Sequence, residues 1–195
     1  MAERPEIILV STSSYRRTLI TRLGLPFRCL APRIDEDSYK NLNLNPETLA
    51  RKLARVKVES VRELAPDAVL IGSDQVVSCD GTLYGKPGTA DAAVKQLLDF
   101  SGRSHELITA VVIRYRDQLI EHADITTVGF RPFDRAAAER YVAADSPLDC
   151  AGSYKLESKG ILLVDRIESR DETAIMGLPL ITVASALREF GFLLP

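Results

Sequence analysis

The sequence has little of the material from which disulfide frameworks and zinc sites are built. It contains three widely spaced cysteines, Cys29, Cys79 and Cys150, and two histidines, His105 and His122. No pair of cysteines has C-x-x-C spacing, and an odd number cannot all pair within one chain. These counts argue against both kinds of site. Because the two histidines lie in expected strands without partners, we assign neither a catalytic role.

The sequence also lacks a strong charge of one sign and a long apolar run. The formal net charge is -2 over 195 residues, so no overall field would hold nucleic acid or an anionic membrane, and phosphate binding must be local. The apolar run 7–10 follows acidic residues and is too short for a signal peptide, and no later run approaches bilayer length. We therefore expect a cytoplasmic protein without nucleic-acid or membrane partners.

The apolar content is sufficient for one substantial core. Hydrophobic residues make up 46% of the chain, and there is no internal repeat, low-complexity tract or flexible linker. We expect residues 1–195 to form a single domain.

Apolar periodicity predicts alternating strands and helices. Strands are expected at 7–10, 68–77, 107–116, 119–130 and 161–164, and helices after 14, after 45, at 90–100, at 135–142 and at 180–190. The pair Asp80-Gly81 is a strong hairpin signal, and a second hairpin should join the two long strands. We therefore predict an α/β fold with a mixed rather than a purely parallel sheet.

Four polar clusters fall where strands end or loops begin, the usual position of ligand sites in α/β folds. The first contains Ser11, Ser13 and Arg16 at the start of a helix, where hydroxyls, backbone N–H groups and a guanidinium can hold phosphate oxygens. The alternative is a plain serine N-cap with solvated arginines, which this segment alone favours.

The second cluster is the acidic turn 35–37, in which Glu36 is a candidate ligand for a divalent cation. Read alone, the turn is better explained as a solvated loop. The third is Asp74, which follows a buried run and needs a cation, a metal or water. The hairpin would return Lys86 towards this acid, and the pair would then be either catalytic or simply structural.

The fourth cluster is the polar loop 152–157, where Lys155 and Glu157 could meet a ligand, but surface charge is the ordinary explanation. Lys57 lies on the helix expected after residue 45 and could reach the same site. Read alone, it is a solvated helix lysine.

Taken together, these clusters resemble the Maf family of nucleoside triphosphate pyrophosphatases over nearly the whole chain. The segments similar to family motifs are 9–17, 34–36, 54–57, 73–76 with 85–87, and 177–179. Ser14 stands where the family usually has proline. The resemblance implies a Maf/ITPase-like fold, with an elongated mixed sheet flanked by helices and two lobes around a central cleft.

The resemblance also implies hydrolysis between the α- and β-phosphates of a small-molecule nucleoside triphosphate, with a divalent metal cation (Mg²⁺, Mn²⁺ or Co²⁺), by a homodimer. Asp74 would be the general base, and Glu36 would hold the metal with it. The residues expected to bind the triphosphate are Ser11, Ser13, Arg16, Lys57 and Lys86.

Three residues bear on the base that is recognised. Most Maf proteins carry D-T at the central acid and prefer dTTP and UTP, whereas this chain has Gln75 after Asp74, Tyr15 before the arginines, and Glu157 in the late loop. It resembles the branch that hydrolyses 7-methyl-GTP. A methylated guanine is cationic and would gain from an aromatic face and an acidic edge.

Two alternatives remain open. One is a dTTP/UTP pyrophosphatase of the same family. The other is a nucleotide-binding regulator of cell division and septum formation, which would bind nucleotide without releasing pyrophosphate. A nucleotide panel separates these functions.

Overall fold

The computed structural model describes residues 4–40, 42 and 44–195. They fall into two compact units, each assembled from separate stretches of the chain. The first unit comprises Met1–Asp74, Thr109–Asp124 and Asp171–Pro195, and the second comprises Gln75–Ile108 and Ile125–Arg170. The expectation of a single domain over 1–195, and of a cleft between two lobes, stays a prediction.

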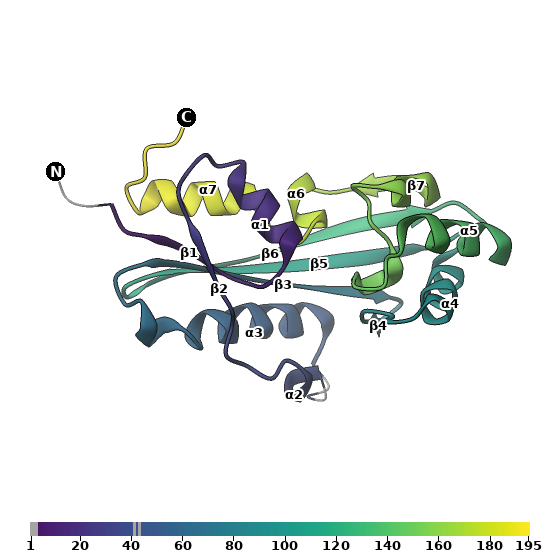
Figure 1. The fold of residues 1–195 in the computed structure, drawn as a ribbon, viewed down its shortest axis with the longest axis horizontal. Coiled ribbons are helices and arrows are strands. Elements are labelled where there is room, and N and C mark those ends of the chain that lie inside the picture. Colours follow the sequence, from purple (N-terminus) through teal and green to yellow (C-terminus); the bar gives the residue numbers. More distant parts are fainter. Residues whose placement is uncertain (1–3, 41, 43) are drawn as a thin grey trace. The chain divides into compact units, whose positions relative to one another are not determined.

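The strands form a seven-stranded mixed sheet in the order β2-β1-β3-β5-β6-β7, with β4 paired to β3 (Figure 1). The strands are β1 Ile7–Val10, β2 Arg28–Leu30, β3 Val69–Cys79, β4 Thr82–Tyr84, β5 Ser104–Tyr115, β6 Gln118–Phe130 and β7 Val164–Glu168. β1 is parallel to β2 and β3, whereas β3–β4 and β6–β7 are antiparallel. The predicted mixed α/β fold is confirmed, as is the hairpin at Asp80-Gly81.

The helices of the described residues are α1 Ser14–Thr21, α2 Asp37–Lys40, α3 Pro46–Glu59, α4 Ala90–Phe100, α5 Arg135–Asp145, α6 Glu172–Ile175 and α7 Leu180–Glu189, with short 3₁₀ turns at Arg62–Leu64, Ala151–Ser153 and Lys159–Leu163. The starts of α3 and α5 are confirmed, because Asn45 and Asp134 accept hydrogen bonds from the backbone N–H groups of Thr48 and Ala137, each at 2.8 Å.

The strand expected at 161–164 is wrong. Residues Lys159–Leu163 form a 3₁₀ turn and β7 begins only at Val164. Ile161 and Leu162 are 49% and 68% exposed, so this apolar run is not a buried strand. A short apolar run does not by itself distinguish a strand from a helical turn.

In the first unit, helices cover both faces of the sheet (Figure 1). One face packs on α1 and α7, in a core that includes Leu9, Ile71 and Leu187. The other face packs on α3. There Gly72 permits a close approach, because an added Cβ would lie 2.6 Å from Val58 Cγ2 and 2.9 Å from the Ala54 carbonyl oxygen. The side chains of α3 are therefore brought directly against β3.

The core of the second unit contains aromatic rings packed around His105. This side chain is 2% exposed, stacks on Phe100 at a centroid distance of 4.4 Å, and has Nε2 2.9 Å from the Tyr154 hydroxyl. The expectation that His105 has no partner is therefore wrong. Burial lowers its pKa to about 4.

Two further features concern the cysteines and the helices of the described residues. None of the three cysteines forms a disulfide. No helix in this part of the chain has the length and apolar character needed to cross a bilayer.

Candidate active site

Asp74 lies at the centre of the candidate site, in a buried ion pair with Lys57. The Asp74 Oδ1 atom accepts a hydrogen bond from Lys57 Nζ at 2.5 Å, and the two side chains are 9% and 5% exposed. Alternation along β3 directs Asp74 to the same face as Gly72, the face that α3 covers. The reading of Lys57 as a solvated helix lysine is therefore wrong, because close packing of α3 buries it beside the acid.

Glu36 joins this pair from the segment before α2. Its Oε1 lies 3.0 Å from Lys57 Nζ, so one ammonium contacts two carboxylates. Because Glu36 Oε1 and Asp74 Oδ1 contact the same nitrogen, the two carboxylates lie close to each other. The explanation of Glu36 as part of a solvated acidic loop is therefore incomplete, although its side chain remains 44% exposed.

Arg16 adds a second cation to the cluster. Its Nε donates a hydrogen bond to the Gly177 carbonyl at 2.7 Å, and its side chain is partly buried. Burial lowers the pKa of the guanidinium, while the charges of Asp74 and Glu36 raise it. The interpretation of Arg16 as a solvated arginine at the start of a helix is therefore wrong.

Burial raises the pKa of Asp74 above its ordinary value, and the nearby charges of Lys57 and Arg16 lower it only in part. A carboxylate with a raised pKa is a better proton acceptor than an exposed one. Two cations and two carboxylates thus meet within the first unit, an arrangement suited to moving a proton close to a bound anion.

The two predicted serines lie at the start of α1. The Ser13 hydroxyl accepts a hydrogen bond from the Arg16 N–H at 3.4 Å and is the N-cap of this helix. The Ser11 hydroxyl accepts one from the Ser13 N–H at 3.1 Å, and Ser11 is 6% exposed. The serine N-cap is thus present, and the phosphate-binding role of both hydroxyls stays a prediction.

The candidate site offers two carboxylates as ligands for a divalent cation, but the described residues provide no complete set of protein ligands. Within the described residues, no group of three or more His, Cys, Asp or Glu side chains could hold a metal ion by itself. Two carboxylates, Glu36 and Asp74, do meet at Lys57. Because Mg²⁺ in phosphate-processing sites is typically held by one or two carboxylates together with substrate phosphates, this pair is sufficient only with a bound polyphosphate.

Three predicted site residues belong to the second unit. Gln75 follows Asp74 on β3. After the hairpin, β4 runs back along β3, and the exposed Lys86 lies two residues beyond the end of β4. Glu157 is exposed on the segment after the 3₁₀ turn Ala151–Ser153. The convergence of Lys86 with Asp74 stays a prediction, as do the roles of Gln75, Glu157 and the partly buried Tyr15 of the first unit.

The polar loop 152–157 is more buried, and makes more hydrogen bonds, than its sequence suggests. Gly152, Ser153 and Tyr154 are buried. Lys155 Nζ donates to the Asp145 carbonyl at 3.1 Å, close to the end of α5. Lys155 thus caps the end of α5, and its contact with a ligand stays a prediction.

Ser73 and Gly177 of the first unit lie in the family-like segments 73–76 and 177–179, but the sequence analysis gave neither a role in the site. Ser73 Oγ lies 2.8 Å from the Gly177 carbonyl oxygen, which also accepts from Arg16. The signals for Ser73 are its polar side chain at the end of the buried run 69–73 and its place in the segment 73–76. A backbone carbonyl leaves no signal in a sequence.

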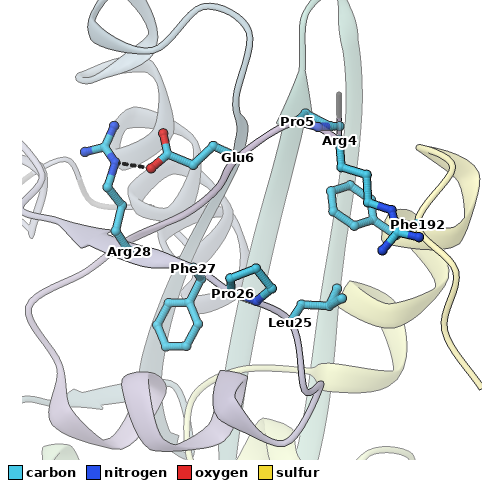
Figure 2. A pocket seen from close by; sticks show the side chains of 8 residues that line it. All are labelled: Arg4, Pro5, Glu6, Leu25, Pro26, Phe27, Arg28 and Phe192. Atoms are coloured by element: carbon cyan, nitrogen blue, oxygen red, sulfur yellow. Dashed lines mark hydrogen bonds and ion pairs between the residues drawn. The ribbon is translucent and has the colours of Figure 1, made fainter. Parts of the chain in front are cut away.

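A separate hollow in the first unit has a volume of about 310 Å³ (Figure 2). It is lined by Arg4, Pro5, Glu6, Leu25, Pro26, Phe27, Arg28 and Phe192. Arg28 and Glu6 form an ion pair at one side of it, at 2.5 Å. None of its lining residues is a predicted site residue.

Comparison with known proteins identifies the family. The chain is 46% identical to a 7-methyl-GTP pyrophosphatase of Bdellovibrio bacteriovorus, over 93% of this chain and 95% of that protein. It is 42% identical to one of Pseudomonas aeruginosa, over 98% and 100% of the two chains. A solved HAM1 protein from Coxiella burnetii covers 95% of this chain at 12% identity, with a TM-score of 0.48. The family model described as Maf-like protein matches residues 6–190, and the chain therefore belongs to that family.

Proposed function

We propose that this chain is a nucleoside triphosphate pyrophosphatase that hydrolyses 7-methyl-GTP to the nucleoside monophosphate and pyrophosphate, removing a modified nucleotide from the pool. The observation that carries the proposal is the buried Asp74 carboxylate, held 2.5 Å from Lys57 in a cluster that also includes Arg16 and Glu36. Family membership supports the reaction class, and the names of relatives more than 40% identical support the substrate.

In the proposed reaction, a water oxygen adds to phosphorus at the α–β anhydride while the bond to the bridging oxygen breaks. Asp74 takes the proton from the water, and pyrophosphate leaves. Arg16 and Lys57 neutralise the charge that develops on the phosphate oxygens. An ammonium has three N–H donors, and the two carboxylates take two of them, so Lys57 retains one for a phosphate oxygen.

Glu36 and Asp74 would hold the divalent cation (Mg²⁺, Mn²⁺ or Co²⁺), which would supply further charge neutralisation for the triphosphate. Lys57 contacts both carboxylates without the cation and so limits their mutual repulsion. Ser11, Ser13 and Lys86 complete the proposed set of triphosphate ligands.

For the base, we assign an aromatic face to Tyr15, an acidic edge to Glu157 and a hydrogen-bonding amide to Gln75. A cationic 7-methylguanine gains from the first two of these groups, whereas uracil and thymine carry no such charge.

The test is pyrophosphate release across canonical and methylated triphosphates with Mg²⁺, Mn²⁺ or Co²⁺, for the wild type and Asp74→Asn. We expect 7-methyl-GTP to be the preferred substrate. Asp74→Asn should lower kcat by about 10²- to 10⁴-fold, because the amide cannot accept the proton. The variant should still fold, because Glu36 remains 3.0 Å from Lys57 Nζ, but it should melt at a lower temperature than the wild type, because Lys57 loses its buried carboxylate partner.

Asp67→Asn is the matched control, since the Asp67 side chain is 83% exposed and its loss should leave turnover unchanged. Turnover of dTTP and UTP in preference to 7-methyl-GTP would favour the other branch of the family. Tight nucleotide binding without pyrophosphate release would favour a regulator. Full activity of Asp74→Asn would exclude Asp74 as the base.

The proposal includes a homodimer that acts in the cytoplasm as a single-domain enzyme on a small-molecule substrate. The family resemblance supports the dimer, and the net charge of -2 gives no reason to invoke nucleic acid or a membrane. Light scattering during size-exclusion chromatography tests the dimer, with a mass near 43 kDa expected as about twice the 21.5 kDa of one chain.

A further inference from the structure

One backbone carbonyl of the first unit receives two side chains that come from distant parts of the sequence. The Gly177 oxygen accepts from Arg16 Nε at 2.7 Å and from Ser73 Oγ at 2.8 Å. A carbonyl oxygen has two lone pairs, so both bonds can form together. Ser73 is 0% exposed and also lies 2.8 Å from the Ala110 carbonyl, so its single proton is shared between two acceptors.

The segment that carries this carbonyl is fixed by buried hydrogen bonds. Asp171 accepts from the N–H groups of Thr173 and Ile181, each at 2.9 Å, through its two different oxygens. Thr173 Oγ1 in turn accepts from the Leu180 N–H at 2.8 Å. Asp171 and Thr173 are 5% and 4% exposed, so these bonds are shielded from competing water. The carbonyl therefore occupies a defined point.

Gly177 is also required by local geometry. Its φ is +100°, a conformation that other residues rarely adopt, and a Cβ at this position would lie 3.3 Å from Arg16 Nε. A side chain here would push against the guanidinium. The chain thus approaches Arg16 with its backbone alone.

We propose that Ser73 and the Gly177 carbonyl are a positioning device for Arg16. A bond at Nε fixes the plane of the guanidinium and leaves its two terminal NH₂ groups for a pair of phosphate oxygens. A lysine at position 16 carries no N–H at the place of Nε and could not be held in this way. The inference rests on the proposed function, because it gives Arg16 a polyphosphate to bind.

A double-mutant cycle between Ser73→Ala and Arg16→Lys tests the proposal, with inorganic tripolyphosphate as the probe and calorimetry as the binding measurement. We expect Ser73→Ala to weaken tripolyphosphate binding about tenfold when Arg16 is present. The Gly177 carbonyl that holds the Arg16 guanidinium then loses its buried hydrogen bond from Ser73. In the Arg16→Lys background the same change should weaken binding less than about twofold. Binding of tripolyphosphate does not require turnover, so inactive variants remain measurable.

Thr109→Val is the matched control. Thr109 is also 0% exposed, and its hydroxyl donates at 2.8 Å to the Ala174 carbonyl of the same segment, three residues before Gly177. It should lower the melting temperature as Ser73→Ala does while leaving tripolyphosphate affinity within about twofold of the wild type. Equal weakening by Thr109→Val and Ser73→Ala would show general loosening of the segment and overturn the proposal.

An equal loss from Ser73→Ala in both Arg16 backgrounds would also overturn it. Failure of the proposed function would look different. A wild type that binds tripolyphosphate but releases no pyrophosphate from any nucleotide would overturn the function, and its binding would still test how Arg16 is positioned. A wild type that does not bind tripolyphosphate would overturn the positioning role of Ser73, while the proposed function is tested separately by pyrophosphate release.

Discussion

Lys57 and Asp74 form a buried pair whose members depend on each other for stability. Removing either charge leaves the other in a poorly solvated place, and such a change typically costs more than the pair itself contributes. Glu36 and Arg16 moderate the imbalance, because each brings an opposite charge to one partner. At the residue scale, the same contacts thus serve folding and the proposed chemistry.

Lys57→Met tests this dependence. We expect it to lower the free energy of unfolding by about 3 kcal/mol, since Asp74 loses its closest cation inside the protein. Adding Asp74→Asn should recover more than half of that loss, because the remaining carboxylate is neutralised. Urea unfolding of the single and double variants measures both effects.

Lys52→Met is the control for this experiment, since Lys52 lies on an exposed part of the same helix and should change stability by less than about 0.5 kcal/mol. A double variant that is less stable than Lys57→Met would contradict the pairing.

At the scale of elements, the contact of α3 with β3 decides where the ammonium lies. Gly72 lets the helix backbone come close, and Lys57 follows Ala54 by one helical turn. The candidate site is therefore built from the packing distance between one helix and one strand. Any change that separates these elements should move Lys57 from both carboxylates.

Gly72→Ala should lower the free energy of unfolding by about 1 to 3 kcal/mol through overpacking, because the new methyl group meets backbone as well as side chain. It should also reduce kcat, since the displaced helix carries Lys57. Thermal unfolding and pyrophosphate release measure the two consequences.

Gly85→Ala is the comparison, because no atom lies within 4 Å of a Cβ at that position, and its stability should match the wild type. A fully stable and active Gly72→Ala variant would contradict the close approach of α3.

The parts of this fold that were predictable from sequence are those with local causes. The caps at Asn45 and Asp134 and the hairpin at Asp80-Gly81 depend on a few adjacent residues. The partner of Asp74 was not predictable in this way, since Lys57 lies 17 positions away and is placed by α3 packing. The short strand β2 gives no periodic signal, and its three residues are paired by β1.

At the scale of the whole molecule, one buried histidine should link stability to pH. His105 is 2% exposed, and no described residue offers a hydrogen-bond partner to its Nδ1. Its pKa falls to about 4, from the ordinary 6.5, because burial disfavours the imidazolium. Between these values the unfolded chain binds the proton and the folded chain does not.

Stability from this group is therefore complete above pH 6.5 and is lost as the pH falls towards 4, by roughly 3 kcal/mol in total. Urea unfolding at several pH values should show this slope. His105→Gln, which cannot titrate, should give a flatter profile over the same range. Identical profiles for the two proteins would contradict the lowered pKa.

The bond between Arg16 and Gly177 joins residues 161 positions apart. A ribosome adds residues in order, at about 5 to 20 per second. Roughly ten to thirty seconds therefore pass between the synthesis of Arg16 and that of Gly177. During that interval the nascent protein cannot possess a finished site, however early its first strands form. Activity should thus arise only after residue 177 has been synthesised, and a message truncated before codon 177 should yield no competent enzyme.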